Sequence, residues 1–225
     1  MTTLTTSPLA PLLGRLFEAA DIAYADMNAA MAELSAEEQT RLMHDLMYSK
    51  TDYLDHYRRL KDVPLPVSRE TGTLLYMLAR SCRARTIVEF GTSFGISTLH
   101  LAAALRDNGG GQLITSEFVP SKVARARDNL IAGGLADLVE IREGDALKTL
   151  SVDLPGAIDL VLLDGAKALY PEILSLVESH LRPGALIVAD NADHSPAYLA
   201  YVRSPANGYL STPFAEDVEL SMRMG

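Results

Sequence analysis

Three oxygen-bearing side chains directly follow two apolar segments that have the pattern of buried strands. Asp164 follows Leu160-Val161-Leu162-Leu163, and Asp190 with Asn191 follows residues 185–189. Strands that are apolar on both faces lie inside parallel sheets, where neighbours are about 4.8 Å apart, so these side chains would meet if the two strands are adjacent. Two carboxylates and an amide oxygen suit Mg²⁺, Mn²⁺ or Ca²⁺ rather than zinc. The alternative is that they are polar loop residues with no metal.

A lysine follows the first of these acids three positions later, in Asp164-Gly165-Ala166-Lys167. A divalent cation beside Lys167 would disfavour its ammonium and lower its pKa, as a general base working near neutral pH requires. Lys167 is therefore a candidate base. A solvated surface lysine is the other interpretation.

A second candidate region is the turn Glu89-Phe90-Gly91-Thr92-Ser93-Phe94-Gly95, where β-branched residues give way to helical spacing. Gly91 and Gly95 allow a sharp turn and close approach of a ligand to the backbone. The pattern lacks the third glycine of the dinucleotide fingerprint G-x-G-x-x-G, and Glu89 would repel a pyrophosphate but attract an ammonium group. A tight turn without a ligand is the alternative.

Two more acids lie where a nucleoside would be bound. Glu117 ends the next predicted strand, at the position where α/β nucleotide folds bind ribose hydroxyls. Asp145, in Gly144-Asp145-Ala146, could accept from an adenine amino group, or it could simply cap the short helix that follows. Both NAD and S-adenosylmethionine contain adenosine, and these residues leave the choice open.

The elements that position these residues alternate between strands and helices from Thr86 onward, which predicts an α/β fold with a doubly wound, mostly parallel seven-stranded sheet. The last two strands are separated by only Ala215-Glu216-Asp217, so they should form an antiparallel hairpin at one end of the sheet. The predicted strands begin at Thr86 and cover 112–117, 139–142, 158–164, 185–189, 208–214 and 218–224, and the predicted helices cover 68–83, 96–105, 120–131 and 170–181.

Residues 1–61 carry no strand signal, and helical spacing predicts two or three helices there. Ser35-Ala36-Glu37-Glu38 has the form of a capping box. We expect one domain over 1–225, in which 1–61 is a lid or a dimerisation segment and 62–225 is the cofactor-binding and catalytic core.

Bulk composition narrows the class of protein. The net charge of −9 argues against a nucleic-acid or membrane-surface binder. The single cysteine, Cys82, cannot form an internal disulfide and is expected to pack against a helix. The sequence contains neither a secretory signal nor a long apolar run, so we expect a cytoplasmic protein.

From about Pro64 to the C-terminus, these motifs jointly resemble the cation-dependent, S-adenosylmethionine-dependent O-methyltransferases related to catechol and caffeoyl-CoA O-methyltransferases. The resemblance implies that Glu89 and Ser97 bind the methionine portion of S-adenosylmethionine, that Glu117 binds its ribose, and that Lys167 is the base. It implies a Mg²⁺ site at Asp164, Asp190 and Asn191, and a homodimer. The full set of expected cofactor-binding residues is Val67, Glu89, Gly91, Thr92, Ser93, Gly95, Ser97, Glu117, Asp145, Ala146 and Asp164, and the expected catalytic residues are Lys167 and Asp164.

The chain also departs from that family. Catechol enzymes carry His-Trp where this chain has Gly165-Ala166, so the wall is smaller and the acceptor could be bulkier. Many relatives have an acid of the final hairpin near the acceptor, a place that Glu216 or Asp217 could fill.

The expected reaction is methyl transfer to a hydroxyl of a small ortho-dihydroxy aromatic, with a divalent cation as Lewis acid and template. Three alternatives stand beside it: a tRNA nucleoside methyltransferase, an NAD-dependent oxidoreductase and a non-catalytic cofactor-binding protein. The acidic charge weighs against the first, and the missing glycine weighs against the second.

Overall fold

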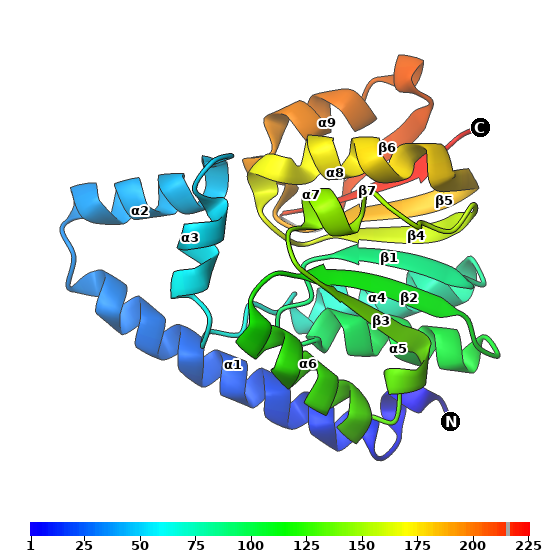
Figure 1. Ribbon diagram of the computed structural model, residues 1–225, viewed down its shortest axis with the longest axis horizontal. Coiled ribbons are helices and arrows are strands. Elements are labelled where there is room, and N and C mark those ends of the chain that lie inside the picture. The colour runs from blue at the N-terminus through cyan, green and yellow to red at the C-terminus, as the bar shows by residue number, and fades with distance from the viewer. Residues whose placement is uncertain (215–216) are drawn as a thin grey trace.

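A mixed seven-stranded sheet forms the centre of the computed structural model, which describes residues 1–214 and 217–225. The strand order is β3-β2-β1-β4-β5-β7-β6 (Figure 1). The chain therefore starts at β1 in the middle of the sheet, adds β2 and β3 on one side, and then crosses to add β4 and β5 on the other. Strands β1 to β5 are parallel, and β7 is antiparallel to both β5 and β6. The strand bounds are β1 Thr86–Phe90, β2 Gln112–Glu117, β3 Val139–Glu143, β4 Ile158–Leu163, β5 Leu181–Ala189, β6 Tyr209–Phe214 and β7 Val218–Arg223.

This topology confirms the predicted fold class and the adjacency on which the metal hypothesis depends. β4 pairs with β5 in register from Leu160 opposite Leu186 to Leu163 opposite Ala189. Asp164 and Asp190 therefore leave the sheet side by side. The predicted hairpin also lies at one end of the sheet, with β6 as its outermost strand.

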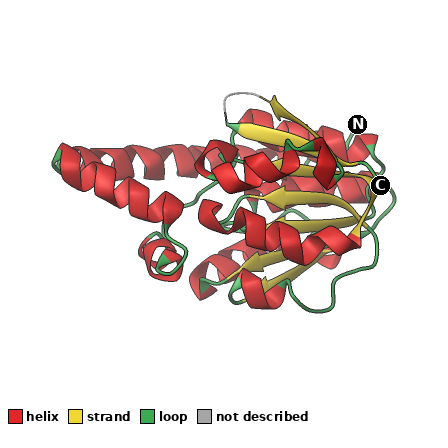
Figure 2. Cartoon of the chain, turned by 90° about the horizontal axis from the view of Figure 1, so that it is seen from above, coloured by secondary structure: helices red, strands yellow, loops and turns green. Residues whose placement is uncertain are grey.

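Helices cover both faces of the sheet because the strands are apolar on both sides. One hydrophobic cluster joins β1 and β4 to α4, α5 and the first half of α1, and the other joins the opposite face to α7, α8 and α9. Figure 2 shows these layers edge-on around the strands. The helix bounds are α4 Arg69–Ser81, α5 Ile96–Asp107, α6 Pro120–Ala132, α7 Ala146–Thr149, α8 Tyr170–Val177 and α9 Pro196–Val202.

The N-terminal segment contains a 3₁₀ turn, Thr3–Thr5, and three helices: α1 Leu9–Ala32, α2 Ala36–Tyr48 and α3 Tyr53–Arg59. The predicted capping box is present, with Ser35 accepting from the Glu38 amide and Glu38 accepting from the Ser35 amide. The buried residues of α1 all lie in its first half, and α2 has none. The second half of α1 and all of α2 project from the α/β core as a helical hairpin (Figure 2).

Two adjoining predicted boundaries are wrong, the end of the helix expected over 170–181 and the start of the strand expected over 185–189. The helix expected over 170–181 ends at Val177, a 3₁₀ turn covers Glu178–His180, and β5 already begins at Leu181. Pro183 and Gly184 interrupt the pairing without ending the strand, since the register to β4 shifts between Ile158 and Leu160. Of the residues described, no helix is both long and apolar enough to cross a membrane.

Candidate active site

The predicted site residues gather where β1, β2, β4 and β5 end, around two adjoining cavities. The first is a narrow space of about 50 Å³ at the ends of β1, β2 and β4, and its lining includes Gly91, Ser93, Glu117, Ala146 and Asp164. The second is a chamber of about 800 Å³ between these strand ends and the N-terminal helices. Tyr57, Leu65, Asp164 and Gly165 line both cavities, so they form the boundary between them.

The turn after β1 requires its glycines. Gly91 has φ of 103°, and a Cβ there would lie 2.5 Å from the carbonyl oxygen of Asp164. Gly95 has φ of 83° and precedes α5. Without a side chain at Gly91 the turn can lie directly against the end of β4, whereas Gly95 lies beside Ala126 of α6.

Glu89 lies beneath this turn and not at the surface of either cavity. Its side chain is fully buried and accepts hydrogen bonds from the Ser97 and Thr98 hydroxyls, each at 2.6 Å. Burial raises the pKa of Glu89 to about 7, although hydrogen bonds from Ser97, Thr115 and Thr98 act to lower it. In this structure the carboxylate ties β1 to the start of α5.

Glu117 meets the sequence expectation more directly, because it lines the first cavity. Its Oε2 accepts from the Ser93 amide at 2.9 Å, and its Oε1 accepts from the Val119 amide at 3.0 Å. Burial raises the pKa of Glu117, while these backbone amides and the Lys122 ammonium act to lower it. Each carboxylate oxygen can accept a further hydrogen bond, as ribose recognition would require.

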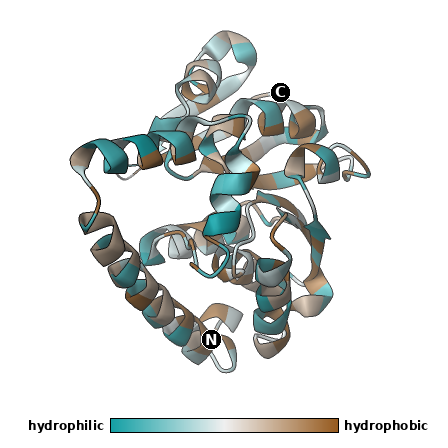
Figure 3. Ribbon diagram, turned by 60° about the vertical axis from the view of Figure 1, so that its left-hand side comes forward, coloured by the Kyte–Doolittle hydropathy of each residue, from teal (hydrophilic) through white to brown (hydrophobic). Residues whose placement is uncertain are grey.

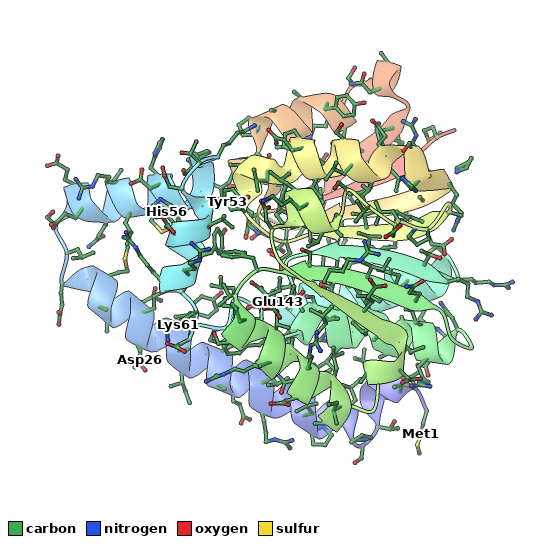
Figure 4. The ribbon with its side chains drawn as sticks, viewed as in Figure 1. Met1, Asp26, Tyr53, His56, Lys61 and Glu143 are labelled. Atoms are coloured by element: carbon green, nitrogen blue, oxygen red, sulfur yellow. The ribbon has the colours of Figure 1, made fainter. Side chains whose placement is uncertain are left out.

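Asp145 caps α7, as one of the two sequence interpretations held. Its Oδ1 accepts from the Leu147 amide at 3.1 Å and also from the Tyr53 hydroxyl of α3 at 2.9 Å. Figure 4 shows Tyr53 where α3 meets the α/β core. An adenine amino group would therefore share or replace the Tyr53 contact.

Six of the eleven expected cofactor residues do not line the first cavity: Val67, Glu89, Thr92, Gly95, Ser97 and Asp145. Val67 is 1% exposed and its side chain packs in the hydrophobic core. Thr92 and Ser97 line a separate small pocket behind the glycine turn. Thr92 is also engaged with Thr115, with 2.6 Å between the two hydroxyls.

Asp164, Asp190 and Asn191 all line the chamber, so the structure brings the predicted metal set together. Burial, and then the charge of Asp164, raises the pKa of Asp190 to about 7. Two buried carboxylates that oppose each other's ionisation are a donor set that a divalent cation would neutralise. Asn191 donates from Nδ2 to Asp217 Oδ2 at 2.9 Å, which leaves its amide oxygen as the group available to a cation.

The candidate set contains only two carboxylates. Across residues 1–214 and 217–225, no group of three or more histidine, cysteine, aspartate or glutamate side chains could hold a metal ion. Any cation at Asp164 and Asp190 would therefore depend on the amide oxygen of Asn191 and on oxygens from water or an acceptor.

Lys167 lies beside these acids, with Nζ 2.9 Å from Asp164 Oδ1 and a side chain only 6% exposed. Burial acts to lower the pKa of Lys167, but Tyr170, Asp164 and Asp190 outweigh it and hold the pKa well above its ordinary value. The residues of the chain alone thus keep the ammonium charged. The lowered pKa expected from the sequence depends on a bound cation.

The aromatic residues around the site were not identified from the sequence. Tyr24 of α1 lines the chamber, and Tyr57 of α3 lies at the boundary of both cavities. Burial, and then the charge of Asp164, raises the pKa of Tyr24 to about 12. The recurrence of Tyr24, Met27, Asn28 and Met31 on one helical face was a readable signal, but it did not indicate what the face contacts.

The small wall at Gly165 has a structural cause. A Cβ at this position would overlap the ring of Phe90, which lies against it. The space left by the missing side chain is thus partly filled by Phe90. Of the two hairpin acids considered, Glu216 lies outside the described residues, whereas Asp217 contacts Asn191 and reaches the candidate site through it.

The fold and site together define a doubly wound α/β protein with an acidic centre at the boundary of two adjoining cavities. Residues 88–192 match the family model of a methyltransferase domain. Catechol O-methyltransferase of Niastella koreensis is 40% identical over 130 residues, which cover 56% of this chain and 58% of the relative. Catechol O-methyltransferase of Mycobacterium tuberculosis is 36% identical over 136 residues, which cover 60% of this chain and 61% of that protein.

A solved structure supports the same assignment. The O-methyltransferase TomG from Streptomyces achromogenes, involved in tomaymycin synthesis and solved in complex with S-adenosylmethionine, superposes with a TM-score of 0.63 and 27% identity. The match covers 81% of this chain and 94% of that one. The chain is thus similar to S-adenosylmethionine-dependent O-methyltransferases across its α/β core. It spans about three fifths of the length of the two curated relatives.

Proposed function

We propose that this protein transfers the methyl group of S-adenosylmethionine to a hydroxyl of an ortho-dihydroxy aromatic, with the assistance of a divalent cation. The observation that carries the proposal is the shared boundary of the two cavities. Tyr57, Leu65, Asp164 and Gly165 line both, so a cofactor that widens the first cavity on binding and an acceptor in the second would meet there. Methyl transfer requires such an encounter, in which orientation alone contributes roughly 7–11 kcal/mol.

The chain's own residues divide the work between the two cavities. Glu117 would accept from ribose hydroxyls, and the glycine turn allows close approach to the rest of the cofactor, which supplies an electrophilic methyl group. Asp164, Asp190 and Asn191 would hold a divalent cation, which when bound supplies positive charge that lowers the pKa of an acceptor hydroxyl. With a cation bound to lower its pKa, Lys167 would be deprotonated and would receive the hydroxyl proton on Nζ, and Tyr57 and Leu65 would exclude water.

The experiment is a methylation assay with catechol, S-adenosylmethionine and Mg²⁺, in which O-methylated product is measured by mass spectrometry. We expect turnover that disappears with a chelator and in Asp190→Ala. Asp193→Ala is the matched control, because Asp193 is an exposed acid in the same loop and should keep wild-type turnover. Full turnover by Asp190→Ala in the presence of chelator would refute the proposed role of the cation.

A homodimer, with residues 1–61 as a lid or dimer contact, also remains part of the proposal. Light scattering of the purified protein tests it directly, since a monomeric mass across the micromolar range would exclude the dimer.

A further inference from the structure

The chamber beside the candidate metal site is far larger than a single aromatic ring needs. At about 800 Å³ it falls within the roughly 300–1,000 Å³ range of pockets that enclose drug-sized ligands. Its floor contains Asp164, Lys167, Asp190 and Asn191. Whatever fills the chamber therefore touches the groups that would act on the acceptor.

The walls of the chamber are largely apolar and adaptable, with polar side chains at Asn28, Gln39, His56 and Arg59. Four of the eight methionines in the chain line it: Met27 and Met31 from α1, and Met43 and Met47 from α2. Unbranched methionine side chains fit apolar ligands of irregular shape. Hydrophobic stretches along α1 and α2 appear as brown segments in Figure 3.

The end of the chamber farthest from this floor lies near the turn between α1 and α2, since Met31, Ala32 and Gln39 line it. Gln39 Nε2 donates to the carbonyl oxygens of Met31 and Leu34, each at 2.9 Å, and so joins the two helices there. Tyr24 lies near the chamber floor and Met31 near this turn, and seven residues of helix separate them by about 10 Å. The chamber is thus deep as well as wide.

We propose that the acceptor is a dihydroxy aromatic with a long or bulky apolar substituent, which extends from the floor between α1 and α2 toward Met31. The inference rests on the proposed function and specifies its substrate class. The apolar face of α2 has no buried residue of its own and would be covered by this substituent. A second copy of the chain is the competing occupant, and the continuity of the chamber with the acidic floor favours the acceptor.

The first test compares catechol with its 4-methyl, 4-butyl and 4-octyl derivatives. Each methylene that enters the chamber should raise kcat/KM about fourfold, which corresponds to about 0.8 kcal/mol, until the substituent reaches the turn. We expect at least a 100-fold higher kcat/KM for octylcatechol than for catechol. Met31→Trp should reduce this ratio at least tenfold, whereas the control Met77→Trp, on an exposed side of α4, should leave it unchanged.

The second test does not require turnover. The chain contains no tryptophan, so Met31→Trp introduces a single fluorophore at the far end of the chamber and Met77→Trp places one outside it. Octylcatechol should shift the tryptophan emission of Met31→Trp and not that of Met77→Trp. Catechol should shift the emission of Met31→Trp much less than octylcatechol does. Such a shift without methylation of any catechol would refute the proposed function, whereas the inference that the chamber binds the apolar substituent would stand.

Two results would overturn the inference. The first is methylation whose kcat/KM does not depend on the length of the alkyl substituent, together with no emission shift in Met31→Trp. This result would leave the proposed function intact. The other is a dimer in light scattering that Met31→Trp dissociates, with no effect of octylcatechol on emission, since a second copy would then fill the chamber.

Discussion

The hydroxyl of Tyr53 donates a hydrogen bond to Oδ1 of Asp145 across 2.9 Å, which joins the N-terminal helices to the loop after β3. Asp145 was expected either to meet an adenine or to cap the following helix, and Tyr53 belongs to a segment for which no site residue was predicted. With Tyr57 one turn further along α3, Tyr53 lines the first cavity and helps to narrow it to about 50 Å³. The N-terminal segment is therefore part of the candidate site.

Removing this hydroxyl should loosen α3. A hydrogen bond of this kind contributes about 1 kcal/mol, so Tyr53→Phe should speed amide exchange over 49–60 about fivefold, measured by hydrogen–deuterium exchange. Tyr201→Phe is the control. Tyr201 lies on α9, and its hydroxyl donates to Glu178 rather than to a residue near α3. Unchanged protection of α3 in Tyr53→Phe would mean that packing alone holds the helix.

Glu89 should make stability depend on pH. Its pKa is raised from 4.5 to about 7 in the folded protein, chiefly by burial, so between these pH values the folded state holds a proton that the unfolded chain has released. Stability from this group is fully present below pH 4.5 and is lost as pH rises through 7, by about 3 kcal/mol in total.

Glu89→Gln removes this ionisation while keeping partners for the Ser97 and Thr98 hydroxyls. The variant should therefore gain free energy of unfolding relative to wild type between pH 5 and pH 8, measured by urea denaturation. Glu18→Gln, at an exposed position on α1, should show no such trend. A constant difference across this range would contradict the raised pKa.

Gly165 should tolerate no side chain. A Cβ there overlaps the Phe90 ring, and overpacking of this kind typically costs about 1–3 kcal/mol, so Gly165→Ala should lower the free energy of unfolding by that amount. Gly156→Ala is the control, because nothing lies within 4 Å of its added Cβ. In a double-mutant cycle, Phe90→Leu should recover part of the loss, and strictly additive effects would show that the two positions do not clash.

A divalent cation should stabilise the folded protein through Asp190. At a Mg²⁺ concentration 100 times its Kd the gain is about 2.7 kcal/mol, which raises the Tm by about 5–10 °C for a chain of this size. Asp190→Asn should abolish the Mg²⁺-dependent rise, and Asp193→Asn should retain it, measured by differential scanning fluorimetry. An equal rise in both variants would place cation binding elsewhere.

Strand positions and strand-end residues could be predicted because both follow from local patterns. A run such as Leu160–Leu163 can lie only between two layers, and parallel strands bring the residues that follow them to one edge. The end of α8 could not be predicted, because Pro183 and Gly184 usually mark a break. Their place in β5 depends on pairing with β4 across a shifted register.

By itself, the sequence determined the doubly wound sheet and the glycine turn and placed Asp164, Asp190 and Asn191 at strand ends, because backbone periodicity fixes where strands stop. That these three side chains meet depends on the pairing of β4 with β5, which the tertiary structure decided. Only the tertiary structure decided that Glu89 is buried beneath its turn, that Val67 packs in the core, and that Tyr53 reaches Asp145. It alone revealed the methionine-lined chamber. The physical reason is that helices α1 to α3 have faces whose periodicity is readable, whereas the partners of those faces are set by packing between residues far apart in the chain.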